Sequence, residues 1–338
     1  MSLTHQKIRF WILVVTVLLL VLLSTCIIAL CTGSAGIPFK SIPKIILHQE
    51  NTAEYQILFN IRLPRILLGI AIGGALSLAG TLLQGMFRNP LVEPYTLGIS
   101  GGASVGVCLN ILLQWYALMG VIAYPLSGFL GAAVVITLVY ILSMKTGTLK
   151  PNSMLLIGVM ISFVSSSVVM LLMAISRSED LQSILFWIMG SLDEPNITLI
   201  KTAGFGSFFG LVLSYFFCLD LNAMSLGEEE AIHLGISIEK TKRNLFVVAS
   251  ILTGLSVSVA GIIMFVGLIV PHFMRMIVGS DHRILLIGSF LAGASFLTMC
   301  DVIARTVISP LELPVGVITG IIGGIIFIYV LNQKKAVI

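Results

Sequence analysis

The sequence contains few charged residues for its length. Only 10% of its 338 residues are Asp, Glu, Lys or Arg, and 57% are hydrophobic, whereas about 25% of a soluble globular domain is charged. This shortage excludes a chain that folds wholly in water. A helix needs about 20 apolar residues to cross a bilayer, so the length accommodates about ten spans and no sizeable soluble domain. We therefore expect an all-α integral membrane protein, with one polytopic domain over residues 1–338.

The sequence also lacks the usual motifs of metal and nucleotide chemistry. It contains no H-E-x-x-H and no G-x-x-x-x-G-K-[ST], so any ATP that drives this protein must be hydrolysed by another chain. Its five cysteines show no C-x-x-C spacing. Because four of them lie in or beside apolar runs, we interpret them as small buried hydrophobic residues and predict no metal site.

Carboxylates are scarce within the expected spans, and Asp301 and Glu312 fall at outer helix ends. Carriers driven by protons or sodium usually hold ionisable residues or broken helices near the midplane of the membrane. This shortage argues against a stand-alone secondary carrier. Ion sites can also be built from backbone carbonyls, so a stand-alone secondary carrier stays an alternative.

The N-terminal apolar run, Phe10–Leu30, follows Lys7 and Arg9. It is longer than the core of about 7–15 residues in a signal peptide, and it lacks an A-x-A-like cleavage site. We expect it to be retained as the first span.

Hydropathy and loop signals predict ten spans. They are Phe10–Leu30, Pro64–Phe87, Tyr95–Leu113, Val121–Met144, Ser153–Ile175, Ile197–Leu219, Leu245–Ala260, Ile262–Val278, Ile284–Cys300 and Pro314–Leu331. A shorter apolar piece, Leu181–Met189, predicts a re-entrant or interfacial helix on the outer side. With the N-terminus inside, inner segments carry twelve Lys and Arg and outer segments carry seven. This bias predicts that both termini are cytoplasmic.

Small residues recur at four-residue spacing, as in Gly69/Gly73, Gly98/Gly102/Gly106 and Gly316/Gly320/Gly324. In lipid, such spacing lets helix backbones approach closely, so we expect these glycines to pack between helices. Residues 98–102 also match G-x-S-x-G, a hydrolase motif that needs a strand-to-helix turn. An intramembrane serine protease that uses Ser100 with His272 is therefore a second alternative.

The longest polar stretch, residues 220–244, predicts a cytoplasmic helix from Leu226 to Leu234. Ser225 and Glu228 have capping-box spacing, and three glutamates follow in the first turn. Gly235 can end the helix in the left-handed conformation. Leu226, Ala231 and Leu234 would offer apolar contacts to a partner. The alternative is a solvated helix that binds no partner.

At the outer side, Arg62 and Arg65 flank Pro64, and Arg305 ends the ninth predicted span. These arginines could bind carboxylates through forked hydrogen bonds, or reach towards lipid phosphates. At the inner side, Pro90 disfavours helix at Asn89. The Asn89–Leu91 segment is then either a simple turn or a constriction at the cytoplasmic mouth.

These segments give the chain a strong resemblance to the FecCD-type permeases, the membrane subunits of ATP-binding-cassette importers for iron siderophores, haem and cobalamin. The resemblance covers nearly the whole chain after the first span. It rests on RLPR (62–65), Gly80 to Gln84, RNPLVEP (88–94), the glycine-rich run Gly98–Gly106, WIMGSL (187–192), LGEEEAIHLG (226–235), FVGLIVPHFMR (265–275), GSDHR (279–283), DVIAR (301–305) and ELPVGVITG (312–320).

The resemblance implies a permease dimer in a bacterial or archaeal inner membrane, with the pore between its subunits. The second subunit would be an identical or a related chain. Two cytoplasmic ATPases would bind ATP and Mg²⁺, so this chain itself would hold no cofactor, and nucleic acid is not expected as a partner. An extracytoplasmic binding protein would deliver substrate and dock on Arg62, Arg65 and Arg305.

The same resemblance assigns roles on the cytoplasmic side. Asn89 and Leu91 would form the cytoplasmic gate. The coupling helix, which transmits motion from the ATPases, would comprise Leu226, Gly227, Glu228, Glu229, Glu230, Ala231, Leu234 and Gly235.

Two further segments resemble pore-lining regions of relatives, namely Asn152 and Ser153, and Ser176, Arg177 and Ser178. Arg177 departs from the small hydroxyl residues expected there. It could favour an anionic chelate, or pair with Glu179 or Asp180. The order of expected substrates is an iron siderophore, then haem, cobalamin and an oxyanion such as molybdate.

Overall fold

The computed structural model describes residues 3–33, 37–38, 42–43, 45, 52–145, 148–149, 151–194 and 196–334. This described part of the chain is almost wholly helical. Its two strands, β1 (Met144–Lys145) and β2 (Thr148–Leu149), form a small antiparallel pair. The structure thus confirms the expected all-α fold class.

Ten helices overlap the ten predicted spans, with ends that differ by up to several residues. They are α1 (Leu3–Cys31), α4 (Leu63–Phe87), α5 (Ile99–Leu112), α7 (Ala123–Ser143), α8 (Pro151–Ile175), α10 (Ile197–Phe216), α13 (Ile238–Ala260), α14 (Val266–Val278), α15 (His282–Thr306) and α16 (Val315–Lys334). In the described residues, seven helices are long and apolar enough to cross a membrane, whereas α5, α14 and α16 are shorter apolar helices.

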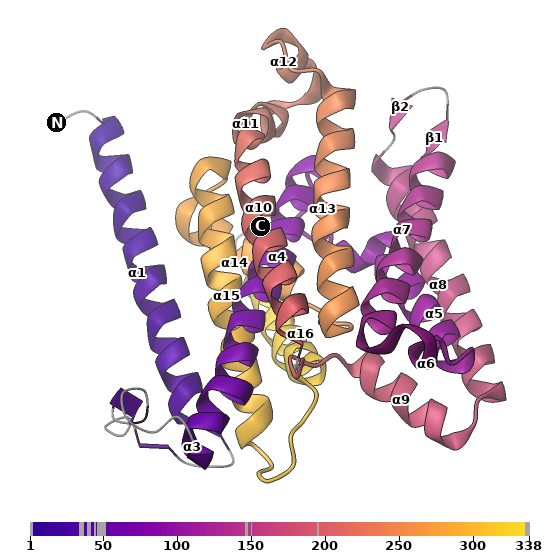
Figure 1. Ribbon diagram of the computed structural model, residues 1–338. Coiled ribbons are helices and arrows are strands. Elements are labelled where there is room, and N and C mark those ends of the chain that lie inside the picture. The colour runs from indigo at the N-terminus through magenta and orange to yellow at the C-terminus, as the bar shows by residue number, and fades with distance from the viewer. Residues whose placement is uncertain are drawn as a thin grey trace.

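The remaining helical elements are short and connect or flank these ten. They are α3 (Ala53–Gln56), η2 (Ile57–Arg62), η3 (Pro94–Leu97), α6 (Trp115–Met119), η4 (Gly120–Ile122), α9 (Ser178–Met189), α11 (Cys218–Leu226) and α12 (Glu228–His233). Helix α9 begins three residues before the short piece that was predicted as interfacial. It lies at the same end of the bundle as α3 (Figure 1).

Helix α4 is the centre of the bundle. It packs against α10, α13, α14 and α15, and its most apolar stretch is 89% buried. A second group, formed by α5, α7 and α8, joins this centre through α13. Figure 1 shows α1 at one edge, against α15, and the α5–α8 group at the other.

Glycines permit the closest helix contacts. A Cβ on Gly80 would lie 1.8 Å from the carbonyl oxygen of Gly267, and one on Gly73 would lie 2.3 Å from that of Gly293. Both pairs join α4 to a neighbour, which confirms the packing role predicted for Gly73. Gly320 is an exception, because a Cβ there would meet nothing within 4 Å. Its face of α16 is therefore open in the single subunit.

The polar connections collect at the two ends of the bundle. The start of α1, the strands β1 and β2, and α12 all lie at the upper end in Figure 1. These are segments that the distribution of Lys and Arg assigns to the cytoplasm. The arrangement places the coupling and gate segments at one end and the outer arginines at the other.

Candidate functional site

The turn after α4 is held by its own hydrogen bonds. Arg88 ends the helix in the left-handed conformation, with φ of 49°. The Asn89 amide then donates to the Gln84 carbonyl at 3.1 Å, and the Asn89 side chain accepts from the Leu91 amide at 2.9 Å. Leu91 is exposed at 51%. Asn89 thus shapes the predicted gate turn, while Leu91 presents an apolar side chain at its surface.

Gln84 ties the base of this turn to α14. Its amide nitrogen donates to the carbonyls of Gly267 and Leu268, at 3.3 and 3.1 Å, and its amide oxygen accepts from Arg275 at 3.0 Å. Gln84 is 2% exposed, so these bonds form without competition from bulk water. These bonds connect α14 to the last turn of α4, next to the gate turn.

Glu93 was not among the residues that we predicted to be functional. The sequence led us to expect few carboxylates within the spans. Its Oε1 accepts a hydrogen bond of 2.6 Å from the amide of Phe265, which immediately precedes α14. Helix α14 has no side-chain cap of its own, and a helix N-terminus favours a carboxylate. The absence of a capping residue before Val266 is the signal that could have indicated this partner.

The coupling segment differs from its predicted form. Residues 218–226 form α11, Gly227 breaks the chain with φ of 139°, and α12 covers only Glu228–His233. The predicted Leu226–Leu234 helix is therefore wrong at its start. The Ser225 hydroxyl donates to the Asn222 carbonyl instead of capping a helix, because α11 continues through it. Gly235 does adopt the predicted left-handed conformation, with φ of 85°.

Three apolar side chains of this segment are exposed, beside the exposed Glu229, Glu230 and His233. Leu226, Ile232 and Leu234 are exposed at 68%, 60% and 63%. Ala231, by contrast, is fully buried and packs inward. Of the predicted apolar contacts, Leu226 and Leu234 are thus available to a partner and Ala231 is not, whereas Ile232 was missed.

Glu228 connects α12 to the gate turn. Its carboxylate lies 2.9 Å from Nζ of Lys242, in α13, and 3.7 Å from the guanidinium of Arg88. The Lys242 side chain is only 5% exposed, so its ammonium depends on this partner. The first residue of α12 is thereby paired with Arg88, the residue that precedes Asn89.

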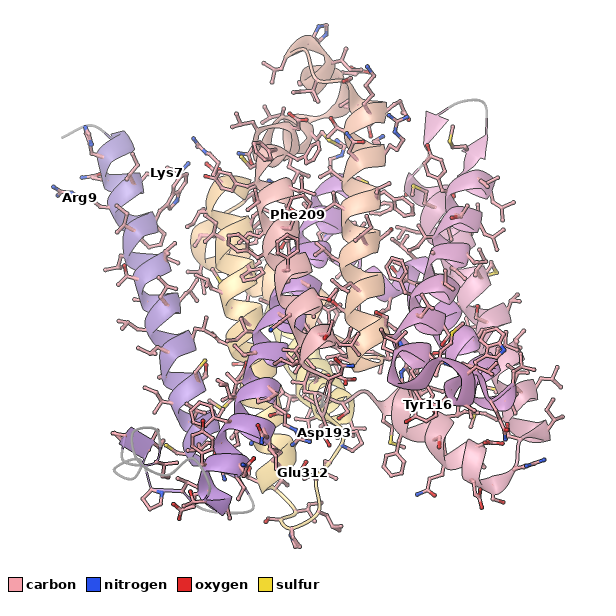
Figure 2. The ribbon with its side chains drawn as sticks, viewed as in Figure 1. Lys7, Arg9, Tyr116, Asp193, Phe209 and Glu312 are labelled. Atoms are coloured by element: carbon pink, nitrogen blue, oxygen red, sulfur yellow. The ribbon has the colours of Figure 1, made fainter. Side chains whose placement is uncertain are left out.

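The three outer arginines are enclosed rather than open. Arg62, Arg65 and Arg305 are 2%, 7% and 4% exposed. The guanidinium of Arg65 lies 2.7 Å from Glu312 and 3.4 Å from Asp193. These two carboxylates lie at the same end of the bundle in Figure 2.

The other two outer arginines also have partners within the chain. Arg305 Nε lies 2.9 Å from the Asp301 carboxylate, and Arg62 donates to the Leu30 carbonyl. A docking partner would therefore have to compete with this chain's own acidic residues. Their role in docking stays a prediction.

The predicted pore-lining residues fall at opposite ends of α8. Asn152 and Ser153 lie in its first turn, and Ser176, Arg177 and Ser178 follow its last. A helix of 25 residues is about 37 Å long, so the two groups cannot form one constriction. Arg177 is exposed, its carbonyl accepts from the Leu181 amide at 2.9 Å, and no ion pair with Glu179 or Asp180 occurs in the described structure.

The serine protease alternative is not supported. Ser100 lies in α5, which packs mainly against α7 and α8, whereas His272 lies in α14, which packs mainly against α4 and α15. The His272 ring makes an edge contact with Phe327, with centroids 6.5 Å apart. The fold thus places the two residues in different helix groups.

The comparisons with known proteins agree with this architecture. The model of the FecCD transport family matches residues 16–333. The chain is 36% identical over 322 residues to the hemin transport system permease protein HmuU of Yersinia pestis, with 94% of this chain and 96% of the relative covered. It is 37% identical to the Fe(3+) dicitrate transport system permease protein FecD of Escherichia coli, at 94% and 97% coverage.

A solved structure has the same fold. It is described as an inward-facing metal-chelate type ABC transporter, and it superimposes with a TM-score of 0.83 at 29% identity, covering 96% of this chain and 99% of that one. ATP hydrolysis in this family belongs to a separate ATPase. The chain is a member of the FecCD transport family, a multi-pass permease subunit of an ABC transporter in a bacterial inner membrane.

Proposed function

We propose that this chain forms half of the translocation pathway of an importer for a metal chelate, with an iron siderophore as the first candidate. Relatives named for hemin and for Fe(3+) dicitrate have similar identity to this chain. Haem, cobalamin and an oxyanion such as molybdate follow as candidates. Because relatives of one fold are named for different chelates, we expect the binding protein to select the substrate.

The observation that carries the mechanism is the position of Glu228. It joins α12 to α13 through Lys242 and to the end of α4 through Arg88. Two cytoplasmic ATPases would dock on the apolar surface of Leu226, Ile232 and Leu234. When ATP draws them together, α12 would move, and the ion pairs would transmit that movement to the gate turn. A two-state element biased from one site is what alternating access requires.

The outer end would receive a substrate-binding protein. Acidic residues on its lobes would displace Asp193 and Glu312 from Arg65, because both of these carboxylates are accessible, at 68% and 42% exposure. The second permease subunit, an identical or a related chain, would pack on faces left open in the single subunit, such as that of Gly320. Both termini would be cytoplasmic.

Reconstitution tests this function. The permease would be placed in liposomes with its ATPase enclosed and its binding protein outside, and loaded with a panel of chelates. We expect uptake that needs ATP and one binding protein with its chelate. Uptake driven by a proton or sodium gradient without an ATPase would instead identify a secondary carrier and overturn the proposal.

A further inference from the structure

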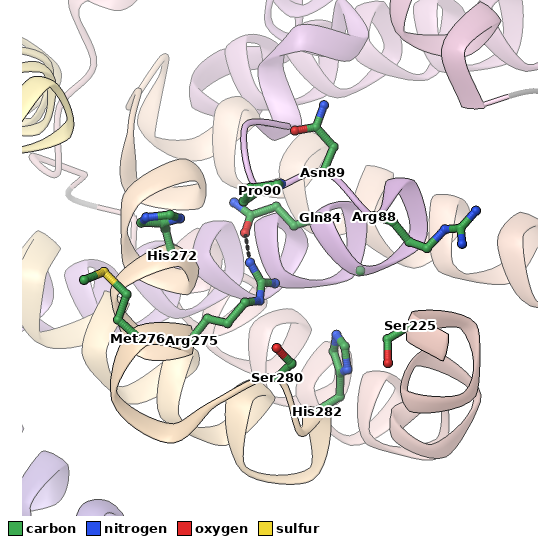
Figure 3. A pocket seen from close by; sticks show the side chains of 11 residues that line it. Gln84, Arg88, Asn89, Pro90, Ser225, His272, Arg275, Met276, Ser280 and His282 are labelled. Carbon is green, nitrogen blue, oxygen red and sulfur yellow. Dashed lines mark hydrogen bonds between the residues drawn. The ribbon is translucent and has the colours of Figure 1, made fainter. Parts of the chain in front are cut away.

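A cavity of about 340 Å³ lies beside the gate turn, at the end of the bundle that carries α12. It is bounded by the last turns of α4 and α14, the first turn of α15 and the end of α11, and Figure 3 shows the side chains that line it. Arg275, His282, Arg88 and Ser225 contribute polar groups to its wall. The transport mechanism assigns this cavity no ligand.

The hydrogen bonds of His282 define its tautomer. The Asn222 amide donates from Nδ2 to the Asp281 carboxylate at 3.0 Å, which fixes Asn222 Oδ1 as the atom that faces the imidazole. That oxygen accepts from the His282 backbone amide at 2.8 Å and lies 2.9 Å from Nδ1. Because a carbonyl oxygen cannot donate, Nδ1 carries the proton, and Nε2 of the neutral ring is an acceptor.

His282 Nε2 has no hydrogen-bond partner in the described structure, although the residue is only 3% exposed. A buried polar atom without a partner is costly, so this nitrogen indicates a missing donor. Gly85 packs against this nitrogen, because a Cβ there would lie 2.8 Å from Nε2. His282 therefore contributes an unused acceptor at the cavity wall.

Arg275 supplies hydrogen-bond donors to the cavity, whereas His282 supplies an acceptor. One of its nitrogens donates to Gln84 (Figure 3), and no carboxylate pairs with it among the described residues. A guanidinium has five N–H donors in a planar fork, so several stay available to an anion. Arg88 adds a second positive charge at the wall, partly balanced by Glu228.

Asp281 immediately precedes His282, but its carboxylate is engaged outside the cavity wall. Asp281 accepts from Arg283 at 2.7 Å and from Lys7 at 3.2 Å, and these bonds hold the pKa of its carboxyl well below the usual range. No carboxylate occurs among the described residues of the cavity wall. A positive, carboxylate-free cavity disfavours a metal cation and favours an anion.

We propose that this cavity binds a phosphate group that carries one proton. Its anionic oxygens would accept from Arg275, and its P–OH would donate to His282 Nε2. Hydrogen phosphate satisfies both requirements at neutral pH, and so does the singly protonated headgroup of phosphatidic acid. Sulfate, an anion of the same shape, has no proton to donate and leaves Nε2 without a partner. This inference does not depend on the proposed substrate.

Calorimetric titration of the full-length chain, purified in detergent without an ATPase, tests the site with inorganic phosphate at pH 7.5. Sulfate at equal ionic strength is the comparison anion. We expect saturable binding of phosphate that is at least tenfold tighter than that of sulfate. Because a hydrogen bond to a charged group is stronger than a neutral one, Arg275→Gln should weaken phosphate binding roughly tenfold or more.

Two substitutions of His282 distinguish the roles of its two ring nitrogens. Asparagine keeps a donor near the Nδ1 position but removes Nε2, whereas glutamine keeps an amide group near the Nε2 position. We expect His282→Asn to abolish the preference for phosphate over sulfate, and His282→Gln to retain part of it. Arg243→Gln, which removes an exposed arginine outside the cavity, is the matched control and should bind phosphate as the original chain does.

The remaining outcomes are also decisive. Equal affinity for sulfate and phosphate would overturn the role of Nε2. If Arg243→Gln and Arg275→Gln weaken phosphate binding equally, the proposed site would be overturned. If free phosphate does not bind, the chain in nanodiscs with phosphatidic acid or phosphatidylcholine distinguishes the lipid source. Retention of phosphatidic acid that needs Arg275 and His282 would support the same chemistry. Absence of both kinds of binding would refute it.

Discussion

Replacing Glu228 with glutamine should disconnect ATP hydrolysis from transport. The substitution keeps the shape of the side chain but removes the partner of Lys242, whose side chain is 5% exposed and 2.9 Å away. Removing one partner of a fully buried pair destabilises by about 3–5 kcal/mol. Because 39% of the Glu228 side chain is exposed, solvent screening reduces this to about 1–3 kcal/mol. The population in which α12 is detached should then rise about 5- to 150-fold.

The assay compares chelate uptake and ATP hydrolysis in the same proteoliposomes. We expect Glu228→Gln to lower the amount of chelate imported per ATP, while hydrolysis continues. Glu229→Gln makes the same change at an exposed neighbour that forms no ion pair in the described structure, so it should leave this ratio unchanged.

A second variant tests the buried lysine itself. Adding Lys242→Met to Glu228→Gln removes the unpaired ammonium and should restore part of the ratio, because a well-packed apolar residue can replace a buried pair. If Glu228→Gln alone imported as much chelate per ATP as the original chain, the ion pairs would not transmit the movement of α12. That result would refute the reasoning.

Three other predictions concern different parts of the bundle. Charge reversal of Arg62 and Arg65 should weaken docking of the binding protein, because the new carboxylates would repel acidic residues on its lobes; unchanged docking at low salt would contradict this. Gly80→Ala places a Cβ 1.8 Å from a carbonyl oxygen of α14 and should destabilise the fold by about 1–3 kcal/mol, seen as a lower midpoint of thermal unfolding in detergent. Gly204→Ala in α10, where a Cβ meets nothing within 4 Å, is its control and should not lower the midpoint. Ser100→Ala should retain uptake, and complete loss with an intact fold would revive the protease alternative.

The sequence predicted the spans well because most of them are long apolar runs that only a membrane accommodates. Helix α13 shows the limit of that signal. It begins at Ile238 rather than at Leu245, since its polar first turns, including Lys242, lie outside the apolar run but continue the same helix. Hydropathy therefore locates the membrane part of a helix and not its ends.

The candidate site was predicted less completely, for reasons that depend on tertiary contacts. The start of the coupling helix was misplaced because Ser225 satisfies capping-box spacing but lies inside α11. The enclosure of Arg65 depends on Asp193 and Glu312, which are far from it in sequence and meet it only in the folded bundle. Glu93 was overlooked for the same reason, as its partner Phe265 is 172 residues away.

The central claim is that an ATPase binds the exposed apolar surface of α11 and α12 and moves the gate through it. Affinity purification of the tagged chain in mild detergent tests it most directly, with Ile232→Asp and Leu234→Asp together as the variant. We predict that an ATPase carrying a Walker loop copurifies with the original chain and is lost from the variant, while the helical fold is retained. An ATPase that binds both proteins equally, or that is absent from both, would contradict the account.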